Sequence, residues 1–236
     1  MMTQAIRTAT LLILFAGIAA PARAQNPPID LSGMWLVQDP GSGSWTDWFF
    51  NAVSIAKPQL QASVIAENKV LADLEAKGEV VNRAQRRFDC PAGSVAMMMA
   101  SSSPLNIVQG RQELLMGAEF GRGRAIALDG RPLPDVKAPG FVATGSGYSV
   151  GRWEGTTLVV QTIGFATDVC DSRRPSGAAA PGGGRVRSTT RLTERYSVKD
   201  DILSVTFTWE DPTVYVAPYT YTYTYRRLPN AEPFEN

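Results

Sequence analysis

Strict alternation of apolar and polar side chains is the clearest pattern in the C-terminal half of the chain. Residues 202–209 read ILSVTFTW, in which large apolar side chains alternate with serine and threonine. Residues 217–228 read APYTYTYTYRRL and set four tyrosines against the intervening threonines, namely Tyr219, Tyr221, Tyr223 and Tyr225. Because successive side chains of a β-strand point to opposite faces, both stretches predict strands with one buried face.

Similar strands are predicted along most of the chain. A short one falls near Met34–Val37, and the others lie near Leu105–Gln109, Gln112–Phe120, Arg124–Leu128, Tyr148–Trp153, Thr156–Ile163, Val186–Ser197, Ile202–Trp209 and Ala217–Leu228. Turn-forming residues separate several of them, at Asp129-Gly130, Glu154-Gly155, Lys199-Asp200-Asp201 and Asp211-Pro212. Successive hairpins without alternating helices favour a mainly β fold, and we expect a single antiparallel β-barrel of about eight to nine strands.

One segment carries a helical period instead. Pro58 suits the first position of a helix, and the apolar residues that follow have spacings close to 3.6, at Leu60, Val64, Leu71 and Leu74. Gly78 is a natural stop, because glycine adopts the left-handed conformation of a helix C-terminus without steric cost. We expect one long N-terminal helix from Lys57 to Gly78, packed outside the barrel or across one end.

The first 24 residues have the organisation of an export signal. One positive charge precedes an apolar run from Leu11 to Ala20, and Ala22-Arg23-Ala24 has the small-x-small pattern of a signal-peptidase site. The run is too short to span a bilayer comfortably, and polar, proline-containing sequence follows it, which argues against a retained anchor. We expect a signal peptide over residues 1–24, one barrel domain over residues 25–236, and a periplasmic or secreted protein.

Charge and the absence of histidine narrow the function classes. Loss of Arg7 and Arg23 with the signal would leave 21 of the 23 basic residues against 22 acidic ones, a net charge near −1. Without a block of lysine or arginine, neither nucleic acid nor an anionic membrane is an expected partner. The missing histidine excludes Ser-His-Asp and Cys-His nucleophile sites and ordinary His-ligated zinc sites. Any chemistry would use carboxylates, phenols, arginine, lysine or backbone groups, and we expect no cofactor or metal.

The chain has two cysteines, Cys90 and Cys170. In an oxidising compartment an even pair predicts a disulfide, which would stabilise the fold by roughly 4–5 kcal/mol in the chain-entropy model. A reactive cysteine is the competing interpretation, but no imidazole is present to activate it.

Three segments each allow two interpretations. The aromatic loop with Trp45, Trp48, Phe49 and Phe50 either covers the core, which is the commoner outcome, or lies at a pocket mouth. Met97–Met99 either fill the core, again the commoner use, or line an adaptable apolar site. The glycine-rich stretch over residues 166–184 is either a flexible excursion or a lid.

Polar side chains in the predicted strands suggest a site. Tyr148, Val150 and Arg152 share one face of their strand, and with Gln161 in the next strand they suit a barrel interior that holds a few polar groups. In the alternative, Arg152 forms only a surface ion pair with Glu154. The tyrosine strand is likewise either a core with concealed acceptors or a pocket wall, with Tyr219 and Tyr225 at the rim or in packing.

Several stretches together resemble an uncharacterised family of exported bacterial β-rich proteins. They are IALDGRPLP, YSVGRWEGTTLVVQTIGF, LTERY, WEDP and PFEN, with DLSGMW near the N-terminus. The family carries a GRWEG(D/T)TLVV(D/Q)TxGF hairpin, and the matching positions here are Arg124, Asp129, Gly130, Arg152, Trp153, Glu154, Gly155, Thr162, Gly164, Phe165, Glu194, Glu210, Asp211 and Pro212. The resemblance implies a lipocalin-like or related closed antiparallel barrel. Relatives often have His and Asp where this chain has Tyr148 and Gln161, so a phenol and an amide would replace that pair.

We expect the barrel interior to receive a small hydrophobic or aromatic molecule. One hypothesis is a cofactor-independent lyase, isomerase or cyclase, whose acid/base or orienting groups are Tyr148, Arg152, Tyr221 and Tyr223. The residues expected to contact the ligand are Arg124, Gln161, Trp153 and Glu210. The other hypothesis is a non-enzymatic periplasmic binding or carrier protein for the same ligand class, which needs the pocket but no matched proton donor and acceptor.

The export signal makes a direct prediction about the mature chain. N-terminal sequencing of protein recovered from the periplasm or medium of a bacterial host should begin at Gln25, because signal peptidase requires the small side chains of Ala22 and Ala24. The Ala24→Tyr variant should keep its full-length mass. A wild-type chain recovered with Met1 or Met2 at its start would contradict the assignment.

Overall fold

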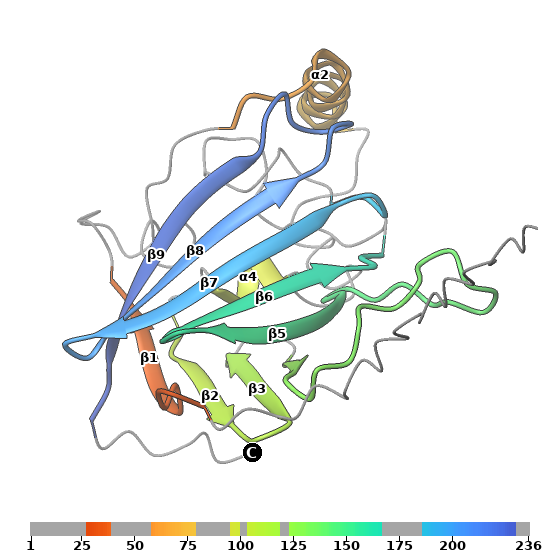
Figure 1. Ribbon diagram of the computed structural model, residues 1–236. Coiled ribbons are helices and arrows are strands. Elements are labelled where there is room, and N and C mark those ends of the chain that lie inside the picture. The colour runs from red at the N-terminus through yellow and green to blue at the C-terminus, as the bar shows by residue number, and fades with distance from the viewer. Residues whose placement is uncertain are drawn as a thin grey trace, which may run out of the picture.

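The computed structural model describes residues 27–38, 58–78, 95–99, 103–118, 123–166 and 186–229. Its strands are β1 (Gly33–Val37), β2 (Leu105–Gln109), β3 (Glu113–Ala118), β4 (Arg124–Ala127), β5 (Tyr148–Glu154), β6 (Thr157–Ile163), β7 (Arg191–Lys199), β8 (Ile202–Glu210) and β9 (Tyr219–Arg227). They form one closed barrel in which neighbours in the sheet are neighbours in the chain, and β1 pairs with both β2 and β9 (Figure 1). The expected mainly β barrel is confirmed.

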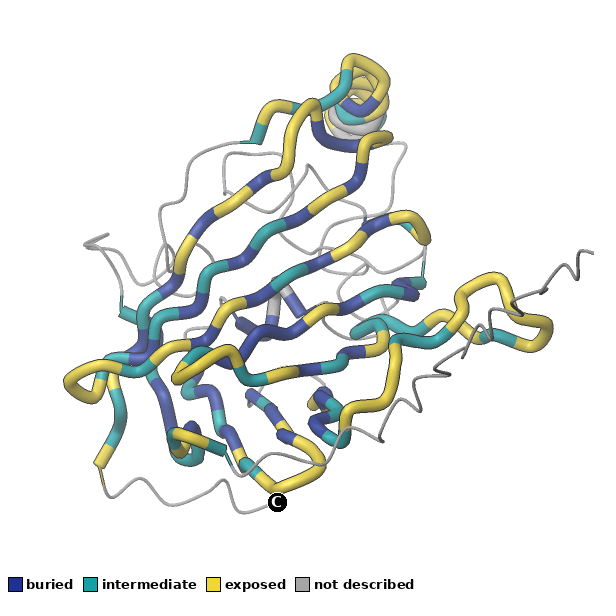
Figure 2. The backbone as a smooth tube through the Cα atoms, in the orientation of Figure 1, coloured by how far each residue is buried: buried dark blue, intermediate teal, exposed yellow. Residues whose placement is uncertain are grey.

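Alternation along the strands separates a buried interior from an exposed surface (Figure 2). The interior side chains of β8 are completely buried, namely Leu203, Val205, Phe207 and Trp209, and each lies opposite a tyrosine of β9. The threonines point outwards, and the hydroxyls of Thr206 and Thr222 lie 2.8 Å apart. The period-of-two pattern therefore supplies both the core and the outer surface of this half of the barrel.

One strand pair departs from the expected antiparallel order. β4 and β5 run parallel, and their register contains only two pairs, Ile126 with Ser149 and Ala127 with Val150. Asp129-Gly130 does form a turn, with Gly130 at φ 80°, but the chain then continues through residues 131–147 before β5 begins. A connection of that length can return the chain to start a strand in the same direction, which a tight hairpin cannot do. The barrel is therefore mixed, and β4 and β5 form its parallel seam.

The other predicted turns close antiparallel pairs. Gly155, at φ 60°, lies in the turn between β5 and β6. Asp200 and Asp201, at φ 51° and 57°, are the two residues between β7 and β8. Positive φ at both positions is typical of a type I′ turn, whose twist matches that of the flanking strands.

Asp211 holds the corner between β8 and β9. Its Oδ1 accepts hydrogen bonds from the backbone and hydroxyl of Thr213, and its Oδ2 accepts from the hydroxyls of Thr189 and Thr190, both at 2.8 Å. Burial acts to raise the pKa of Asp211, but these hydrogen bonds outweigh it and lower the pKa below its ordinary value. The strand predicted from Val186 begins only at Arg191, because residues 186–190 form a turn that bonds to this carboxylate.

The long helix, α2 (Ala62–Ala76), lies at one end of the barrel near the connection between β8 and β9 (Figure 1). It begins later than the sequence predicted, because Leu60 pairs with Tyr215 in an isolated antiparallel bridge and the Gln61 backbone donates to Val214. Gly78, at φ 71°, follows its last turn as expected. Among the side chains of α2 that the structure describes, Val64 is the one buried in the core.

A short helix, α4 (Val95–Met99), contributes to the core. Met98 and Met99 are buried, which confirms the core-filling interpretation for these two residues. The Met99 carbonyl accepts a hydrogen bond from the Tyr225 hydroxyl. Tyr225, expected at the rim or in packing, is therefore a deeply packed residue with a concealed acceptor.

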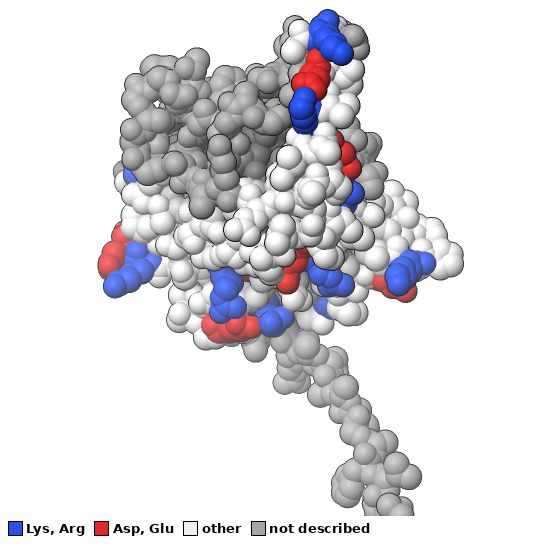
Figure 3. Space-filling view, turned by 90° about the horizontal axis from the view of Figure 1, so that it is seen from above, with Lys and Arg blue, Asp and Glu red and all other residues white. Residues whose placement is uncertain are grey.

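Several predictions fall outside the described residues. They are the signal peptide over residues 1–24, the aromatic loop with Trp45, Trp48, Phe49 and Phe50, the cysteines Cys90 and Cys170, and the glycine-rich stretch over residues 167–184. Within the described ranges, no helix combines the length and apolar character needed to cross a membrane. On the face seen in Figure 3, described basic side chains lie beside acidic ones.

Gly151 makes the interior packing near the parallel seam testable. A Cβ at this position would lie 2.7 Å from a methyl carbon of Leu128 and 3.1 Å from methyl carbons of both Ile126 and Leu158. Gly151→Ala should therefore lower the free energy of unfolding by about 1–3 kcal/mol, measured by urea titration. Gly117→Ala is the matched control, because a Cβ there meets nothing within 4 Å. Equal stability of the two variants would contradict the packing described.

Candidate functional site

A buried ion pair crosses the interior face of four neighbouring strands. Arg124 on β4 makes a two-pronged contact with Glu194 on β7, from Nη1 to Oε1 at 2.9 Å and from Nη2 to Oε2 at 2.8 Å. The two side chains are only 2% and 0% exposed. Ser149 on β5 and Thr162 on β6 lie between them and accept hydrogen bonds from Nη2 of Arg124 at 2.8 and 3.2 Å. The Tyr196 hydroxyl donates to Glu194 Oε1 at 2.7 Å.

Arg124 and Tyr196 each keep one protonation state near neutral pH. Burial acts to lower the pKa of Arg124, but the charge of Glu194, the Tyr196 phenol and the hydrogen bonds to Glu194 together outweigh it and raise the pKa above its ordinary value. Burial, and then the same carboxylate, raises the pKa of the Tyr196 phenol well above its usual range. Arg124 therefore stays charged and Tyr196 stays a hydrogen-bond donor. The Arg124 Nε is the one buried side-chain polar atom of the described residues without a hydrogen-bond partner.

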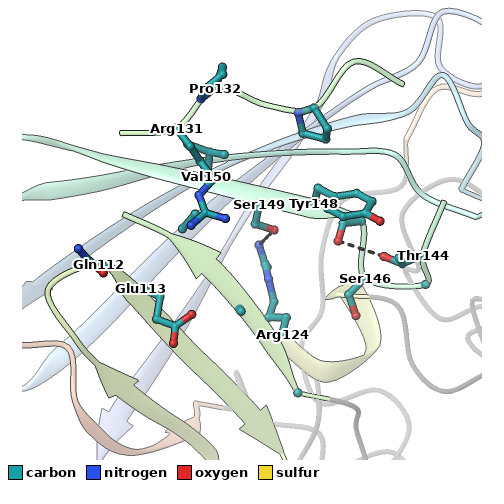
Figure 4. Close-up of a pocket in the computed structure, with 16 residues that line it drawn as sticks. Gln112, Glu113, Arg124, Arg131, Pro132, Thr144, Ser146, Tyr148, Ser149 and Val150 are labelled. Atoms are coloured by element: carbon teal, nitrogen blue, oxygen red, sulfur yellow. Dashed lines mark hydrogen bonds between the residues drawn. The ribbon is translucent and has the colours of Figure 1, made fainter. Parts of the chain in front are cut away.

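A pocket of about 590 Å³ opens beside this network, where β4 and β5 separate (Figure 4). Its walls come from the start of β3, from β4, from the connection after β4 and from residues 144–150. They combine outward-facing side chains, such as Ala125 and Tyr148, with Arg124 and Ser149, which face the barrel interior. The pocket therefore reaches from the outer surface to the edge of the buried network.

Most polar groups of the pocket already have partners. Arg131 binds both oxygens of Asp129, and this contact lowers the pKa of Asp129 to about 2, so that the pair remains ionised. The Tyr148 hydroxyl donates to the Val142 carbonyl at 2.8 Å. Glu113 is different, because its carboxylate forms no ion pair or hydrogen bond with any described residue. In Figure 4, Glu113 and Arg131 lie on one side of Arg124, and Tyr148 lies on the other.

The face predicted to line the interior is the outer face of β5. Tyr148 is 36% exposed, and the Arg152 side chain is 60% exposed and pairs with Glu154 at 2.9 Å, as in the surface alternative. Gln161 faces outwards in register with Val150. The interior side is instead formed by Ser149, which serves Arg124, and by Gly151, which leaves room for neighbouring side chains. The prediction of the buried face of β5 was therefore wrong.

The remaining predicted site residues also divide between surface and core. Glu210 is exposed at the end of β8, and Trp153 is half-buried against the core. Tyr221 and Tyr223 are buried, with ring centroids 5.1 Å apart, and the Tyr221 ring stacks on Phe207 at 5.0 Å. These contacts are those of a packed aromatic core.

The Tyr221 phenol is itself tied into this core. The Trp209 indole N–H donates to its oxygen at 3.0 Å. Burial raises the pKa of Tyr221 well above its ordinary value, so the group stays protonated.

Arg124 is the predicted ligand-contacting residue that lies at both the pocket and the buried network. Ser149, Thr162 and Glu194 were missed as its partners. The signal was present in LTERY, where Glu194 alternates in phase with Leu192 and Tyr196 and so belongs to the buried face of its strand. A carboxylate on a buried face requires a cationic partner, and Arg124 is the residue that meets this requirement.

Comparisons with known proteins do not assign the site. No family model matches the chain, and no curated protein matches it. The resemblance to the exported bacterial β-rich family therefore stays a prediction. Within the ranges that the structure describes, no group of three or more His, Cys, Asp or Glu side chains could hold a metal ion.

Removal of one charge from the buried pair should be costly. Glu194→Gln leaves the Arg124 charge without a counter-charge in the core and should lower the free energy of unfolding by about 3–5 kcal/mol, measured by urea titration. Glu154→Gln, which breaks the exposed pairs with Arg152 and Arg195, is the matched control and should leave the stability close to that of the wild type.

The double variant Arg124→Met/Glu194→Gln tests whether charge is the cause. It removes the buried cation and keeps an amide oxygen for Tyr196, so it should recover at least about half of the loss. A double variant that is less stable than Glu194→Gln would show that the loss comes from packing and hydrogen bonds of the pair and not from the unpaired charge of Arg124.

Proposed function

We propose that the protein binds a small molecule in the pocket beside the parallel seam and does not transform it. The observation that carries the proposal is the pocket of about 590 Å³, a size within the range of small-molecule sites, with polar and apolar walls. Tyr148 and the two prolines Pro132 and Pro134 offer apolar surface. Gln112 and Ser146 offer hydrogen-bonding groups.

Binding is favoured over turnover by the state of the titratable groups. Acid/base catalysis needs a donor and an acceptor that are free to exchange protons with a ligand. Around the pocket, Arg131 is bound to Asp129, and Arg124 is bound to Glu194. Among the described residues, Glu113 has no hydrogen-bonding or ion-pair partner, and Arg131, which feels its charge, is already bound to Asp129. The arrangement supports the binding or carrier hypothesis more strongly than a lyase, isomerase or cyclase.

The site differs from the interior cavity expected from the sequence. The tyrosines that were candidates for a cavity wall pack against one another and against Phe207, whereas the pocket opens at the place where the sheet is least continuous. With the predicted signal peptide, the proposal is a periplasmic or secreted binding protein for a small, largely apolar molecule.

A retention experiment tests the proposal. Purified protein is incubated with the small-molecule fraction of a bacterial cell extract, passed through gel filtration, and analysed for bound compounds by mass spectrometry. We expect a compound that is retained and chemically unchanged. Conversion of that compound by the protein would favour the enzyme hypothesis instead.

Two variants locate the retained compound. Ala125→Trp places a large ring in the pocket from an exposed position of β4 and should abolish retention. Thr222→Trp adds the same ring to the exposed face of β9, away from the pocket, and should retain the compound as the wild type does. Equal retention by both variants would exclude this pocket as the binding site.

A further inference from the structure

The free donor of Arg124 faces the parallel seam. The end of the guanidinium is occupied by Glu194, which binds Nη1 and Nη2. In a planar guanidinium, the Nε–H lies on the same edge as the outer hydrogen of Nη2, and that hydrogen is directed at Ser149 on β5. The unpartnered Nε–H therefore points along the edge that faces β5, where Arg124 and Ser149 both line the pocket.

The buried Nε–H of Arg124 is a hydrogen-bond donor without an acceptor, which is energetically unfavourable. Buried N–H groups almost always have a partner, and those that lack one within the protein are commonly met by a ligand or an ordered water. The Arg124 side chain is 2% exposed and Nε itself is buried. A ligand oxygen can therefore reach Nε only from the side of the pocket that Arg124 lines, and only when the pocket wall shifts to admit it.

The charges around the pocket select the kind of acceptor. Glu194 neutralises Arg124, and Asp129 neutralises Arg131. Glu113 lines the same pocket and forms no direct ion pair with a described residue, although its charge contributes to the raised pKa of Arg131. A carboxylate ligand would gain one hydrogen bond from Nε but would lie in a pocket whose remaining charge is negative, so a neutral oxygen is favoured.

We infer that the pocket takes an uncharged molecule whose carbonyl oxygen accepts a hydrogen bond from Nε of Arg124 while its apolar part lies against Tyr148 and Pro134. The inference rests on the proposed binding function and adds the ligand class. Amides, ketones and esters with a flat apolar body have this chemistry, whereas the corresponding acids are anions at neutral pH.

Three probes of similar size and different charge test the ligand class. N-methylbenzamide, benzoate and benzylammonium are titrated into isotope-labelled protein, and binding is followed through the NMR shifts of the amides of Tyr148, Ser149 and Val150. N-methylbenzamide should bind with a dissociation constant at least about tenfold below that of benzoate, which the charge of Glu113 repels. It should also bind at least about tenfold more tightly than benzylammonium, which Glu113 attracts but which has no acceptor for the Nε–H of Arg124.

Glu113→Gln tests the selection against anions. Loss of the lone carboxylate should improve benzoate binding by about tenfold and leave N-methylbenzamide nearly unchanged. Glu210→Gln removes an exposed carboxylate of β8 outside the pocket and should change neither.

Arg124→Lys, which keeps a cation for Glu194 but has no Nε–H, should lose N-methylbenzamide binding. Should that variant fail to fold, the ranking of the probes and the Glu113→Gln result decide the question.

The outcomes separate the inference from the function on which it rests. Preferential binding of N-methylbenzamide, with the expected response of Glu113→Gln, supports both. Benzoate or benzylammonium binding as tightly as N-methylbenzamide at the same amides overturns the ligand class and leaves the binding function standing. No shift of these amides with any of the three probes overturns both.

Discussion

The ion pair between Arg124 and Glu194 joins the barrel across the place where its backbone pairing is shortest. The parallel seam has two register pairs, whereas β7 and β8 share nine. With so few backbone hydrogen bonds, the pairing of β4 with β5 is weak. The guanidinium instead reaches past Ser149 and Thr162 to the carboxylate on β7, so that one side chain connects four successive strands. Buried charges are tolerated only when each is paired and hydrogen-bonded, and this requirement fixes the positions of all the partners.

The same constraint shapes the pocket. Strands that separate after two pairs leave a gap, and the long connection that makes the pairing parallel supplies one wall of that gap through Arg131 and the prolines beside it. Because Glu194 takes the end of the guanidinium, the Nε edge of Arg124 remains directed toward β5. Closure of the barrel and the chemistry of the pocket thus depend on one residue, which is rigid because it is buried and bound at four acceptor atoms.

The sequence predicted the fold best where one face of a strand is plainly apolar. In β8 and β9 the contrast between aromatic or aliphatic side chains and threonine determines which side is buried, and the structure agrees. In β5 the contrast is absent: one face holds Tyr148 and Arg152, the other Ser149 and Gly151, and neither is apolar. The buried face is decided there by Arg124 and by the neighbours of Gly151, which lie on other strands. The direction of β5 was missed for a related reason, since it depends on the path of residues 131–147 and not on any local turn.

The four tyrosines of β9 show how phenols can fill the interior of a barrel. Tyr221 receives the Trp209 N–H, and Tyr225 donates to the Met99 carbonyl, so these two hydroxyls have concealed partners and their rings supply apolar contact. This arrangement makes the β7–β9 side of the barrel a packed wall. These rings fill the interior beside β7, β8 and β9 and leave little room there for a ligand. The seam between β4 and β5 lies across the barrel from β9 and has more room. The aromatic core thus fills the interior on its side of the barrel, which is why the binding site proposed above lies at the gap beside Arg124.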